Sequence, residues 1–531
     1  MRIQLLLLLS SFCFADSLKI LMFNPGFGHS HMRFMGGIAD ILIEAGHEIT
    51  EIRSTLDTTA RWQGISKSQE ILLYPVHPEV EEMMADMHSG REGGFMSQIW
   101  TQVMSPAKMS KMAVNMTKAF AKACEHVVFE TDLLQTLKGR HFDLGISESF
   151  DDCGHGIFEV LGIKTVITTS SSNLMEHQAI LIGVPRVPSY VPGALADTSE
   201  KMTITQRAFN AIGSYFGAKM FLTLLDGQTE VFRKHMGPDF TDLRELISRS
   251  AVVFTNTQPY IDFPKPTIYK VIDIGGIHIK DTSNQRLDEE WNKILNKKKK
   301  TVLISFGSVA KSFAMPVSYK KSIIEVVKGM PDVQFIWKYE KDDLNTWELP
   351  ENLYLSKWTP QNALLADPRL SLFVTHGGLA STMEIAYSGT PALVVPLFAD
   401  QSRNAQVLMR QGVAEKILKF DLENTQKLSE VIKGMLADAS YKQKAQPLSA
   451  MLKNTPFRPK DLLLKNLEFV AKFGSLPQLD PYGRQLSFIQ YYLLDVFAAF
   501  VLAAISVLVI AFFVLRFLFR LCFQKSKPKR D

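Results

Sequence analysis

The sequence predicts an α/β protein with two separate parallel-sheet regions and a membrane-spanning helix near the C-terminus. Short apolar runs that end in glycine-bearing loops alternate with segments of helical spacing, first near the N-terminus and again after residue 300. A run of twenty uncharged residues occupies 496–515. At 531 residues the chain also exceeds what one hydrophobic core usually organises. We therefore expect two globular domains and a membrane attachment.

The N-terminus has the features of a secretory signal peptide over residues 1–15. Arg2 precedes the apolar run Leu5–Leu9, and small residues lead to a cleavage point near Ala15. The run is too short to span a membrane as an anchor. A buried first strand is the alternative interpretation.

The first α/β region is expected over residues 16–280. Residues 18–23 form an apolar run that stops at the turn-forming residues 24–28, and helical spacing follows from Phe34 to Ala45. Gly46 closes that helix before the next strand. Further along, residues 175–240 are apolar without clear periodicity. They could line a pocket for apolar molecules, touch a membrane or pack as ordinary helices.

The second α/β region is expected over residues 301–480, after a polar linker at 281–300 that ends in four lysines. Strands are predicted at 301–306, 370–375 and 392–395, and a helix at 379–388. The final helices before the membrane segment, about 428–473, are expected to brace the two regions.

The C-terminal segment predicts a single-pass membrane protein. The helix 496–515 is followed by a basic tail at 516–531, and an excess of Lys and Arg marks the cytoplasmic side. The domains would then be lumenal. Lys527 and Lys529 resemble the dilysine signal that returns membrane proteins to the endoplasmic reticulum; simple stop-transfer charge is the alternative.

The charge and the cysteines restrict the class of protein. The net charge is only +5, and six basic residues between Arg516 and Arg530 exceed it, so the rest of the chain is close to neutral and nucleic acid is not an expected partner. Cys124 and Cys153 are the cysteines expected to remain in the lumen, and their spacing does not decide whether they pair. Use of the glycosylation acceptor Asn115 and homo-oligomerisation stay open.

A glycine turn before the helix at 379–388 predicts an anion site. His376, Gly377 and Gly378 precede the helix N-terminus, where backbone N–H groups and the helix dipole favour a phosphate. Ser381 and Glu384 share a face of that helix, and the carboxylate suits ribose hydroxyls. Nearby, Trp358 offers an aromatic face and Gln361 an amide for a nucleobase. Asp400 offers a carboxylate and Gln401 an amide for the hydroxyl groups of a sugar.

The run from Trp358 to Gln401 resembles the signature of the UDP-glycosyltransferase superfamily, and the resemblance extends from the signal peptide to the basic tail. It implies two facing, doubly wound, Rossmann-like domains of the GT-B type, with UDP-sugar bound by the second and the acceptor by the first. Trp358 would stack on uracil with help from Gln361. Glu384 would bind the ribose, and Asp400 and Gln401 would bind the donor sugar. The diphosphate would be bound by four residues: Ser308, His376, Gly377 and Gly378. Ala380 departs from the pattern, because many members carry a polar residue or glycine there; Ser381 could compensate.

The catalytic base is expected in the first domain. His31 lies in the loop between the first strand and its helix, and an imidazole near neutrality can take a proton from an attacking hydroxyl. His29 is the rival candidate. The partner that orients the base would be Glu148, which aligns with the aspartate of the family, and Asp151 and Asp152 are fallback partners.

The resemblance and the residues together predict an inverting transfer of glucose or glucuronate from a UDP-sugar to a hydroxyl of a small lipophilic acceptor, as in detoxification. No Asp-x-Asp pair occurs in the sequence, so no metal or other cofactor is expected. The donor sugar and the acceptor are not identified. The alternative is a catalytically impaired lumenal protein that binds a UDP-sugar or a lipid.

Overall fold

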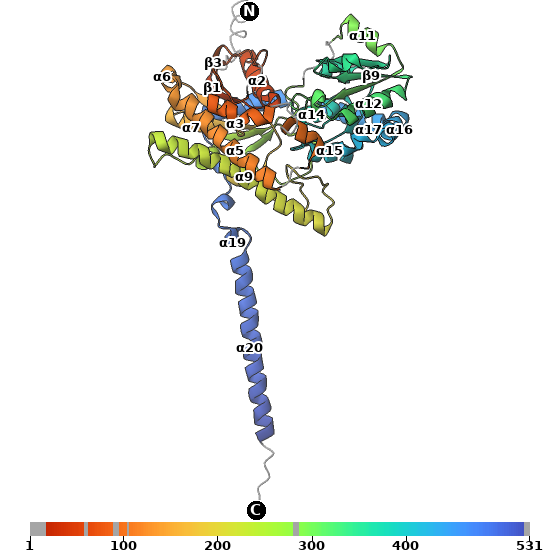
Figure 1. The fold of residues 1–531 in the computed structure, drawn as a ribbon. Helices are drawn as coiled ribbons and strands as arrows, with labels where there is room; N and C mark the ends of the chain where they lie inside the picture. Colours follow the sequence, from red (N-terminus) through yellow and green to blue (C-terminus); the bar gives the residue numbers. More distant parts are fainter. Residues whose placement is uncertain (1–16, 58–61, 89–94, 104–105, 280–285, 525–531) are drawn as a thin grey trace, which may run out of the picture. The chain divides into compact units, whose positions relative to one another are not determined.

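The computed structural model describes residues 17–57, 62–88, 95–103, 106–279 and 286–524. The chain divides into two units, 1–479 and 480–531. The predicted signal peptide and the last residues of the basic tail, including the lysines of the dilysine pattern, lie outside the described residues. Figure 1 colours the whole chain from red at the N-terminus to blue at the C-terminus.

The first α/β region contains a seven-stranded sheet in which all neighbouring strands are parallel. The strand order is β3-β2-β1-β4-β5-β6-β7. Their bounds are β1 Lys19–Gly26, β2 Glu48–Thr55, β3 Glu70–Tyr74, β4 Leu144–Glu148, β5 Val166–Ser170, β6 Val252–Thr255 and β7 Val271–Asp273. The strand order reverses between β1 and β4, and this is where doubly wound sheets place their sites.

Both faces of this sheet are covered, because successive side chains of β1 enter different cores. Ile20 and Met22 pack with helices α2 (His29–Glu44) and α18 (Pro459–Phe473). Leu21 and Phe23 pack on the opposite side with α7 (Cys153–Val160). The remaining helical segments of the region are α3 Pro78–His88, α4 Phe95–Thr101, α5 Pro106–Glu125, the π-helix η1 His126–Glu130, α6 Leu133–Leu137, α8 Glu176–Ile182, α9 Ile204–Met236 and α10 Leu243–Ser248.

The second α/β region contains a six-stranded parallel sheet in the order β10-β9-β8-β11-β12-β13. Its strands are β8 Lys300–Ser305, β9 Val333–Lys338, β10 Leu353–Ser356, β11 Leu370–Thr375, β12 Ala392–Val394 and β13 Ala414–Lys416. Its helices are α11 Glu289–Leu295, α12 Val317–Lys328, α13 Gln361–Ala366, α14 Leu379–Ser388, α15 Gln401–Arg410, α16 Thr425–Ala437 and α17 Ser440–Lys453.

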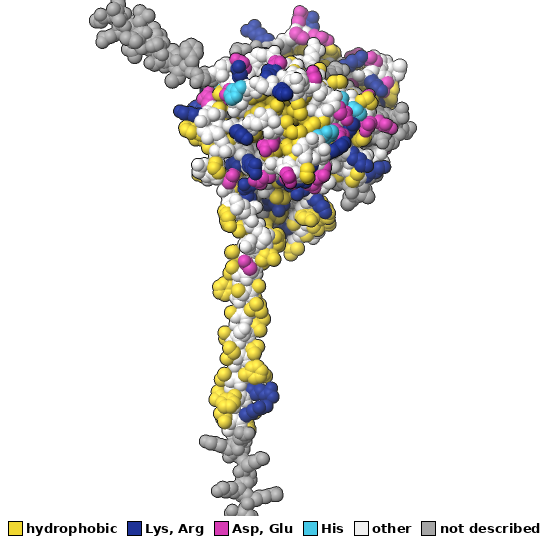
Figure 2. Space-filling model, turned by 90° about the vertical axis from the view of Figure 1, so that its left-hand side faces the viewer, with side chains coloured by type: hydrophobic (Ala, Val, Ile, Leu, Met, Phe, Trp, Pro, Cys, Tyr) yellow, Lys and Arg dark blue, Asp and Glu magenta, His cyan; other side chains and the backbone are white. Residues whose placement is uncertain are grey.

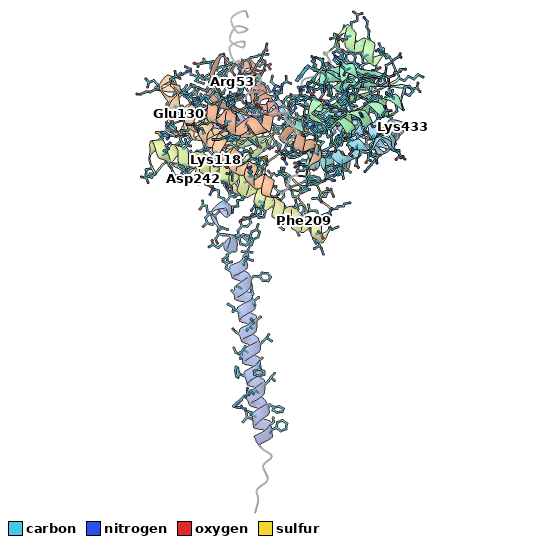
Figure 3. All side chains as sticks on the ribbon, viewed as in Figure 1. Arg53, Lys118, Glu130, Phe209, Asp242 and Lys433 are labelled. Atoms are coloured by element: carbon cyan, nitrogen blue, oxygen red, sulfur yellow. A yellow bond between two sulfur atoms is a disulfide. The ribbon has the colours of Figure 1, made fainter. Side chains whose placement is uncertain are left out.

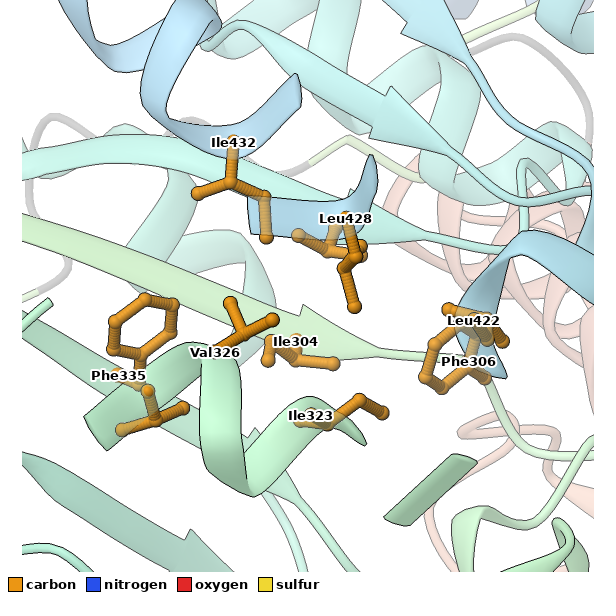
Figure 4. A pocket seen from close by; sticks show the side chains of 10 residues that line it. Ile304, Phe306, Ile323, Val326, Phe335, Leu422, Leu428 and Ile432 are labelled. Carbon is orange, nitrogen blue, oxygen red and sulfur yellow. The ribbon is translucent and has the colours of Figure 1, made fainter. Parts of the chain in front are cut away.

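The core of the second region is tightly filled around β8. A small void in this core is lined by ten side chains, all of them apolar, including Ile304, Ile323 and Leu428 (Figure 4). Such a void has no group that could hold a phosphate or a sugar hydroxyl. The void is therefore part of the core, and the candidate site lies at the strand ends instead.

The two regions contact each other through buried polar pairs. Arg403 of α15 donates to Asp262, in the segment after β6, at 2.6 Å, and both side chains are buried. Gln258 Nε2 donates to the hydroxyl of Tyr387 on α14 at 3.0 Å. Helix α18, near the end of the first unit, returns to pack on α2 and β6 of the first region.

Two segments differ from the sequence-based expectations, and a third is decided between interpretations. Residues 289–295 of the expected linker form α11, and its Trp291 packs in the core of the second region beside Leu303. In the stretch 175–240, for which ordinary helices were one of the interpretations, the structure contains α8 and the 33-residue helix α9. The expected membrane helix is longer than 496–515: α20 runs from Leu494 to Gln524 and includes Arg516 and Arg520.

The second unit contains the membrane-spanning candidate. Within residues 494–523 an 18-residue window has a mean hydropathy of 3.0, which suits a helix that crosses a bilayer. Hydrophobic side chains cover the surface of α20 (Figure 2). Short helical turns precede it: η7 Tyr482–Gln485 and α19 Phe488–Tyr491.

Candidate active site

His31 and Glu148 meet at the carboxyl ends of β1 and β4, which are neighbours in the sheet. His31 lies in the first turn of α2, and Glu148 is the last residue of β4. The His31 Nδ1 atom is 3.3 Å from Glu148 Oε1. The structure thus brings together the predicted base and its predicted carboxylate partner.

Ser171 completes this group, and sequence reasoning missed it. Its Oγ atom is 2.5 Å from His31 Nδ1 and donates to Glu148 Oε1 at 2.8 Å, while its backbone N–H donates to the same oxygen at 3.2 Å. The backbone N–H of Phe150 donates to Glu148 Oε2 at 3.1 Å. Ser171 follows β5, the strand beside β4, so the strand-end rule was the signal that could have found it.

Glu148 is held as a carboxylate. Burial alone would raise its pKa, but the charge of His31 and the hydrogen bonds from His31 and Ser171 lower the pKa below its ordinary value of 4.5. A buried carboxylate beside the ring favours the imidazolium that forms when a base accepts a proton.

The fallback carboxylates are engaged elsewhere. Asp151 Oδ1 accepts hydrogen bonds from Gln228 at 2.6 Å and from the backbone of Cys153 at 3.2 Å. Asp152 lies beside the buried His155 at 3.3 Å. Burial raises the pKa of Asp151 to about 7 and that of Asp152 well above its ordinary range. Asp151 and Asp152 therefore contact other buried polar groups, and Glu148 is the carboxylate that contacts His31.

An aromatic group adjoins His31. The ring of Phe150 is 4.8 Å from the His31 ring between centroids, and Phe27 stacks on Phe150 at 5.1 Å. Phe120 of α5 and Phe221 of α9 approach Phe150 edge-on at 5.9 and 5.5 Å. The base thus borders an apolar wall built from four separate segments.

The loop around His376 depends on glycine. A Cβ atom on Gly307 would lie 2.6 Å from the His376 ring, and one on Gly378 would lie 2.7 Å from its Nε2 atom. Gly377 has φ of 80°, which favours glycine, and Gly378 is the N-cap of the ten-residue helix α14. The loop can therefore place backbone N–H groups of the helix N-terminus close to a ligand.

Lys338 is a second residue that sequence reasoning missed. It ends β9, donates to the carbonyl of Gly307 at 2.7 Å and lies 5.0 Å from the centroid of the Trp358 ring. Burial and the Lys338 charge lower the pKa of His376 to about 4, so this histidine is neutral at physiological pH. An ammonium group and a neutral imidazole thus lie beside the glycine loop. Ser308 lies in the turn after Gly307.

The residues predicted for a nucleoside also come together. Gln361 donates to Glu384 Oε2 in a short hydrogen bond and to Ser381 Oγ at 3.3 Å. Burial raises the pKa of Glu384 to about 7, against the opposing effects of Gln361 and of Arg33 from the first region. Trp358 is 62% exposed, so one face of its ring is open to stacking.

Asp400 and Gln401 follow a strained turn. Ala399 has φ of 55°, a left-handed conformation that is costly for alanine. Gln401 accepts from the backbone of Leu397 at 2.8 Å through its side-chain oxygen, so its amide N–H groups are the part that can serve a sugar hydroxyl. Burial raises the pKa of Asp400, and the hydrogen bond from Asn404 and the charges of His31 and Arg403 partly oppose this.

A cluster of potential metal ligands occurs outside the candidate active site. Among the described residues, donor atoms of His77, His126 and Glu130 lie within 4.8 Å of one another. Glu130 is already paired with Lys122 at 2.6 Å and with His126 at 3.1 Å. None of these residues belongs to the predicted site, and we assign no role in transfer to them.

Comparison with known proteins decides the family. The family model described as UDP-glucoronosyl and UDP-glucosyl transferase matches residues 19–529. The chain belongs to this family. It is 28% identical over 523 residues to the ugt-48 protein of Caenorhabditis elegans, named as a UDP-glucuronosyltransferase, with 97% of each chain covered. A UDP-glucuronosyltransferase of Pleuronectes platessa is 27% identical over 471 residues, 87% of this chain and 97% of that one.

Solved structures agree on the fold of this UDP-glycosyltransferase. The kitacinnamycin glycotransferase matches with a TM-score of 0.58 at 15% identity, covering 86% of this chain and 98% of that one. Phytolacca americana UGT2, solved with UDP-2fluoro-glucose and pterostilbene, matches with a TM-score of 0.56 at 15% identity, covering 86% and 100%. The fold is therefore GT-B, as predicted, and the chain is an enzyme that transfers sugar from a UDP-sugar.

Proposed function

We propose that this enzyme transfers glucose or glucuronate, with inversion, from a UDP-sugar to a hydroxyl of a small lipophilic acceptor. The observation that carries the proposal is the position of His31, which pairs with Glu148 on one side and borders the aromatic wall of Phe27 and Phe150 on the other. An apolar molecule held against that wall would present its hydroxyl to the base.

In this mechanism His31 takes the acceptor proton as the oxygen attacks the anomeric carbon. Its Nδ1–H group donates toward Ser171 and Glu148, which orients the ring and stabilises the imidazolium. A single displacement by one base inverts the anomeric centre.

The leaving diphosphate is stabilised by the second region. We assign this role to the N-terminus of α14, to His376, Gly377, Gly378 and Ser308, and to Lys338, whose charge lies beside the loop. Trp358 and Gln361 would hold the uracil, Glu384 the ribose, and Asp400 with Gln401 the sugar. This arrangement supplies positive potential from the protein, and no metal is part of the proposal.

We also place the enzyme in the endoplasmic reticulum membrane, with the catalytic unit lumenal and the C-terminus cytoplasmic. The disulfide between Cys124 of α5 and Cys153 of α7 supports this, because such bonds persist in oxidising compartments. The apolar helix α20 and the basic residues Arg516 and Arg520 near its end agree with this orientation.

A donor and acceptor screen tests the proposal. The full chain in detergent would be incubated with UDP-glucose, UDP-glucuronate or UDP-galactose and a panel of phenols and sterols, with products analysed by mass spectrometry. A β-glycoside, identified from its anomeric proton by NMR, is expected from an α-linked donor. A chain that binds UDP but forms no glycoside with any pair would instead support a catalytically impaired binding protein.

A further inference from the structure

Helix α4 is a segment of the first region that packs in the core of the second. The helices on either side of it in the chain, α3 and α5, contribute to one core of the first region. Ile99 and Trp100 of α4 are buried instead in the core of the second region, together with residues of β8 and α16. In Figure 3, Lys118 marks α5 and Lys433 marks α16. The chain therefore inserts α4 into the second region and then returns to the first.

Trp100 contacts the segment that leads into the glycine loop of the candidate active site. The centroids of the Trp100 and Phe306 rings are 5.0 Å apart, and the rings are edge-on. Phe306 comes two residues before Ser308, which is predicted to bind the diphosphate. Helix α4 therefore lies against one of the segments that are expected to hold the donor.

Lys419 connects α4 to another segment of the candidate site. It is the first residue of the 3₁₀ turn η5 (Lys419–Glu423). Its Nζ atom donates to the carbonyl oxygens of Ile99 and Gln102, both at 2.6 Å, at the C-terminal end of α4. The same ammonium donates to the carbonyl oxygen of Leu397 at 3.2 Å. The last carbonyl groups of a helix have no partner within the helix, and a cation there also faces the negative end of the helix dipole.

Leu397 begins the segment that is expected to hold the donor sugar. Its backbone N–H donates to Gln401 Oε1 at 2.8 Å, and the N–H of Phe398 donates to the same oxygen at 3.1 Å. Ala399 lies between them in its left-handed conformation. A strained residue of this kind persists only where its surroundings hold it in place. The segment 397–401 is therefore fixed from inside by Gln401 and from outside by Lys419.

Burial of the Lys419 ammonium is unfavourable by itself. Lys419 is only 7% exposed, and burial lowers its pKa below the ordinary value of 10.5. An ammonium inside a protein is destabilising unless hydrogen bonds replace its contacts with water. The three carbonyl groups provide these bonds. A methionine would fill a similar space without a buried charge, so the contribution specific to the lysine is the connection between α4 and Leu397.

We propose that Lys419 is a positioning residue for the donor sugar, and that α4 is the anchor through which the first region stabilises the segment 397–401. A bound sugar and the docked α4 then stabilise each other, because both favour the same arrangement of this segment. The inference rests on the proposed function, in which Asp400 and Gln401 hold the sugar. Because α4 belongs to the region that carries the aromatic wall, the connection links the sugar to the acceptor side.

Calorimetry on the full chain in detergent tests the positioning. UDP-glucose, UDP-glucuronate and UDP would be titrated separately, and the UDP-sugar that binds the native enzyme more tightly would be compared with UDP. Lys419→Met should raise the Kd of that UDP-sugar about tenfold and change the Kd of UDP by less than about twofold. Lys419→Arg keeps a cationic donor and should restore most of the affinity. Equal losses for UDP and the UDP-sugar, or no loss for either, would contradict the proposal.

Lys442 provides the matched control. Its Nζ atom donates to the carbonyl oxygen of Gly389, at the C-terminal end of α14, at 2.8 Å. Burial lowers the pKa of Lys442 as well. Lys442→Met therefore also removes a lysine from the end of a helix, and it should lower the thermal unfolding temperature without changing the ratio of the two Kd values. An equal rise of this ratio in both variants would reduce the role of Lys419 to general stability and overturn the inference.

Hydrogen exchange of the native enzyme tests the coupling without a variant. The coupling between two sites is reciprocal, so a saturating UDP-sugar should slow the exchange of the backbone amides of residues 99–102 by up to about tenfold relative to saturating UDP. Lys419→Met should abolish this difference. Exchange at the same rate with UDP and with the UDP-sugar in the native enzyme would overturn the role of α4.

Gln401→Ala separates a failure of this inference from a failure of the proposed function. If Gln401 holds the sugar, this variant should raise the Kd of the UDP-sugar and leave the Kd of UDP nearly unchanged. A normal Kd for the UDP-sugar in the Gln401 variant would remove the proposed sugar site, and the inference with it. A loss in the Gln401 variant together with no loss in Lys419→Met would overturn the inference alone.

Discussion

The two sheets each present a histidine after a strand, but the charged neighbours of the two rings differ. His31 has the buried carboxylate of Glu148 at 3.3 Å. His376 has the ammonium of Lys338 as its charged neighbour, and its pKa is lowered to about 4. A carboxylate favours the imidazolium, whereas burial beside an ammonium keeps a ring neutral.

This difference shows that a position in the fold does not set the chemistry of a residue. Both histidines occupy strand ends of parallel α/β sheets, where such folds place their sites. The neighbouring side chains make one ring suited to accept a proton and the other suited to donate a hydrogen bond to a phosphate. The following predictions test that division.

The largest effect is expected at His31. His31→Ala should lower kcat by up to roughly 10⁴-fold, because it removes the proton acceptor. UDP binding measured by calorimetry should be retained, since the nucleotide residues lie in the second region. His376→Ala is the matched comparison and should mainly raise KM for the UDP-sugar. Full turnover by the His31 variant would move the base to His29 or elsewhere.

Glu148→Gln should have the next largest effect. The amide cannot stabilise the imidazolium, so kcat should fall on the order of 10²–10³-fold with little change in KM for the donor. In the native enzyme the lowered pKa keeps Glu148 ionised at neutral pH, and its contribution should be lost only as the pH falls through that lowered value. Steady-state kinetics from pH 5 to 8 measure the loss in kcat and should show no titration of Glu148 in this range; an unchanged kcat would show that Glu148 does not contribute to catalysis.

The prediction for Asp151 concerns the free energy of unfolding and not the catalytic rate. Its pKa is raised from 3.8 to about 7, so between these values the folded protein holds a proton that the unfolded chain has lost. Stability should therefore fall as the pH rises through this window. Asp151→Asn removes that loss and should stabilise the protein at pH 8 by roughly 1–3 kcal/mol, with a smaller difference at pH 4. Thermal unfolding at the two pH values measures this; a variant that is less stable at pH 8 would contradict the protonated carboxyl.

Ser171→Ala should have the smallest effect. It removes a hydroxyl that contacts both His31 and Glu148 but leaves the direct contact at 3.3 Å. We expect about a tenfold loss in kcat, equivalent to about 1.4 kcal/mol, with the KM values unchanged. Ser171→Thr keeps the hydroxyl and should recover most of the rate. A change in KM alone would indicate a role in binding an acceptor.

Much of the fold follows from local patterns in the sequence. The buried strand at 370–375 and the helix at 379–388 occur as predicted, because apolar runs, turn glycines and helical spacing all agree there. The pairing of His31 with Glu148 was also expected, since both residues match a family pattern. The assigned roles of the nucleotide residues remain predictions.

Residues that act through tertiary contacts were not found from the sequence. Ser171 and Lys338 occur in segments without distinctive spacing, and each joins the site only through the order of the strands. Helices were only one of the interpretations of the segment that contains α9, for another reason. Its first half exposes apolar side chains while its second half buries them, so the residues show no consistent helical periodicity.

The position of α18 has a consequence for biosynthesis. Leu463, Leu467 and Val470 are fully buried beside Ile20 and Met22 of β1, although more than four hundred residues separate them along the chain. During translation the part of this sheet face that α18 covers stays exposed until α18 leaves the ribosome. The core of the N-terminal half is therefore completed only when almost the whole polypeptide has been made, and apolar surface that is exposed until then favours aggregation.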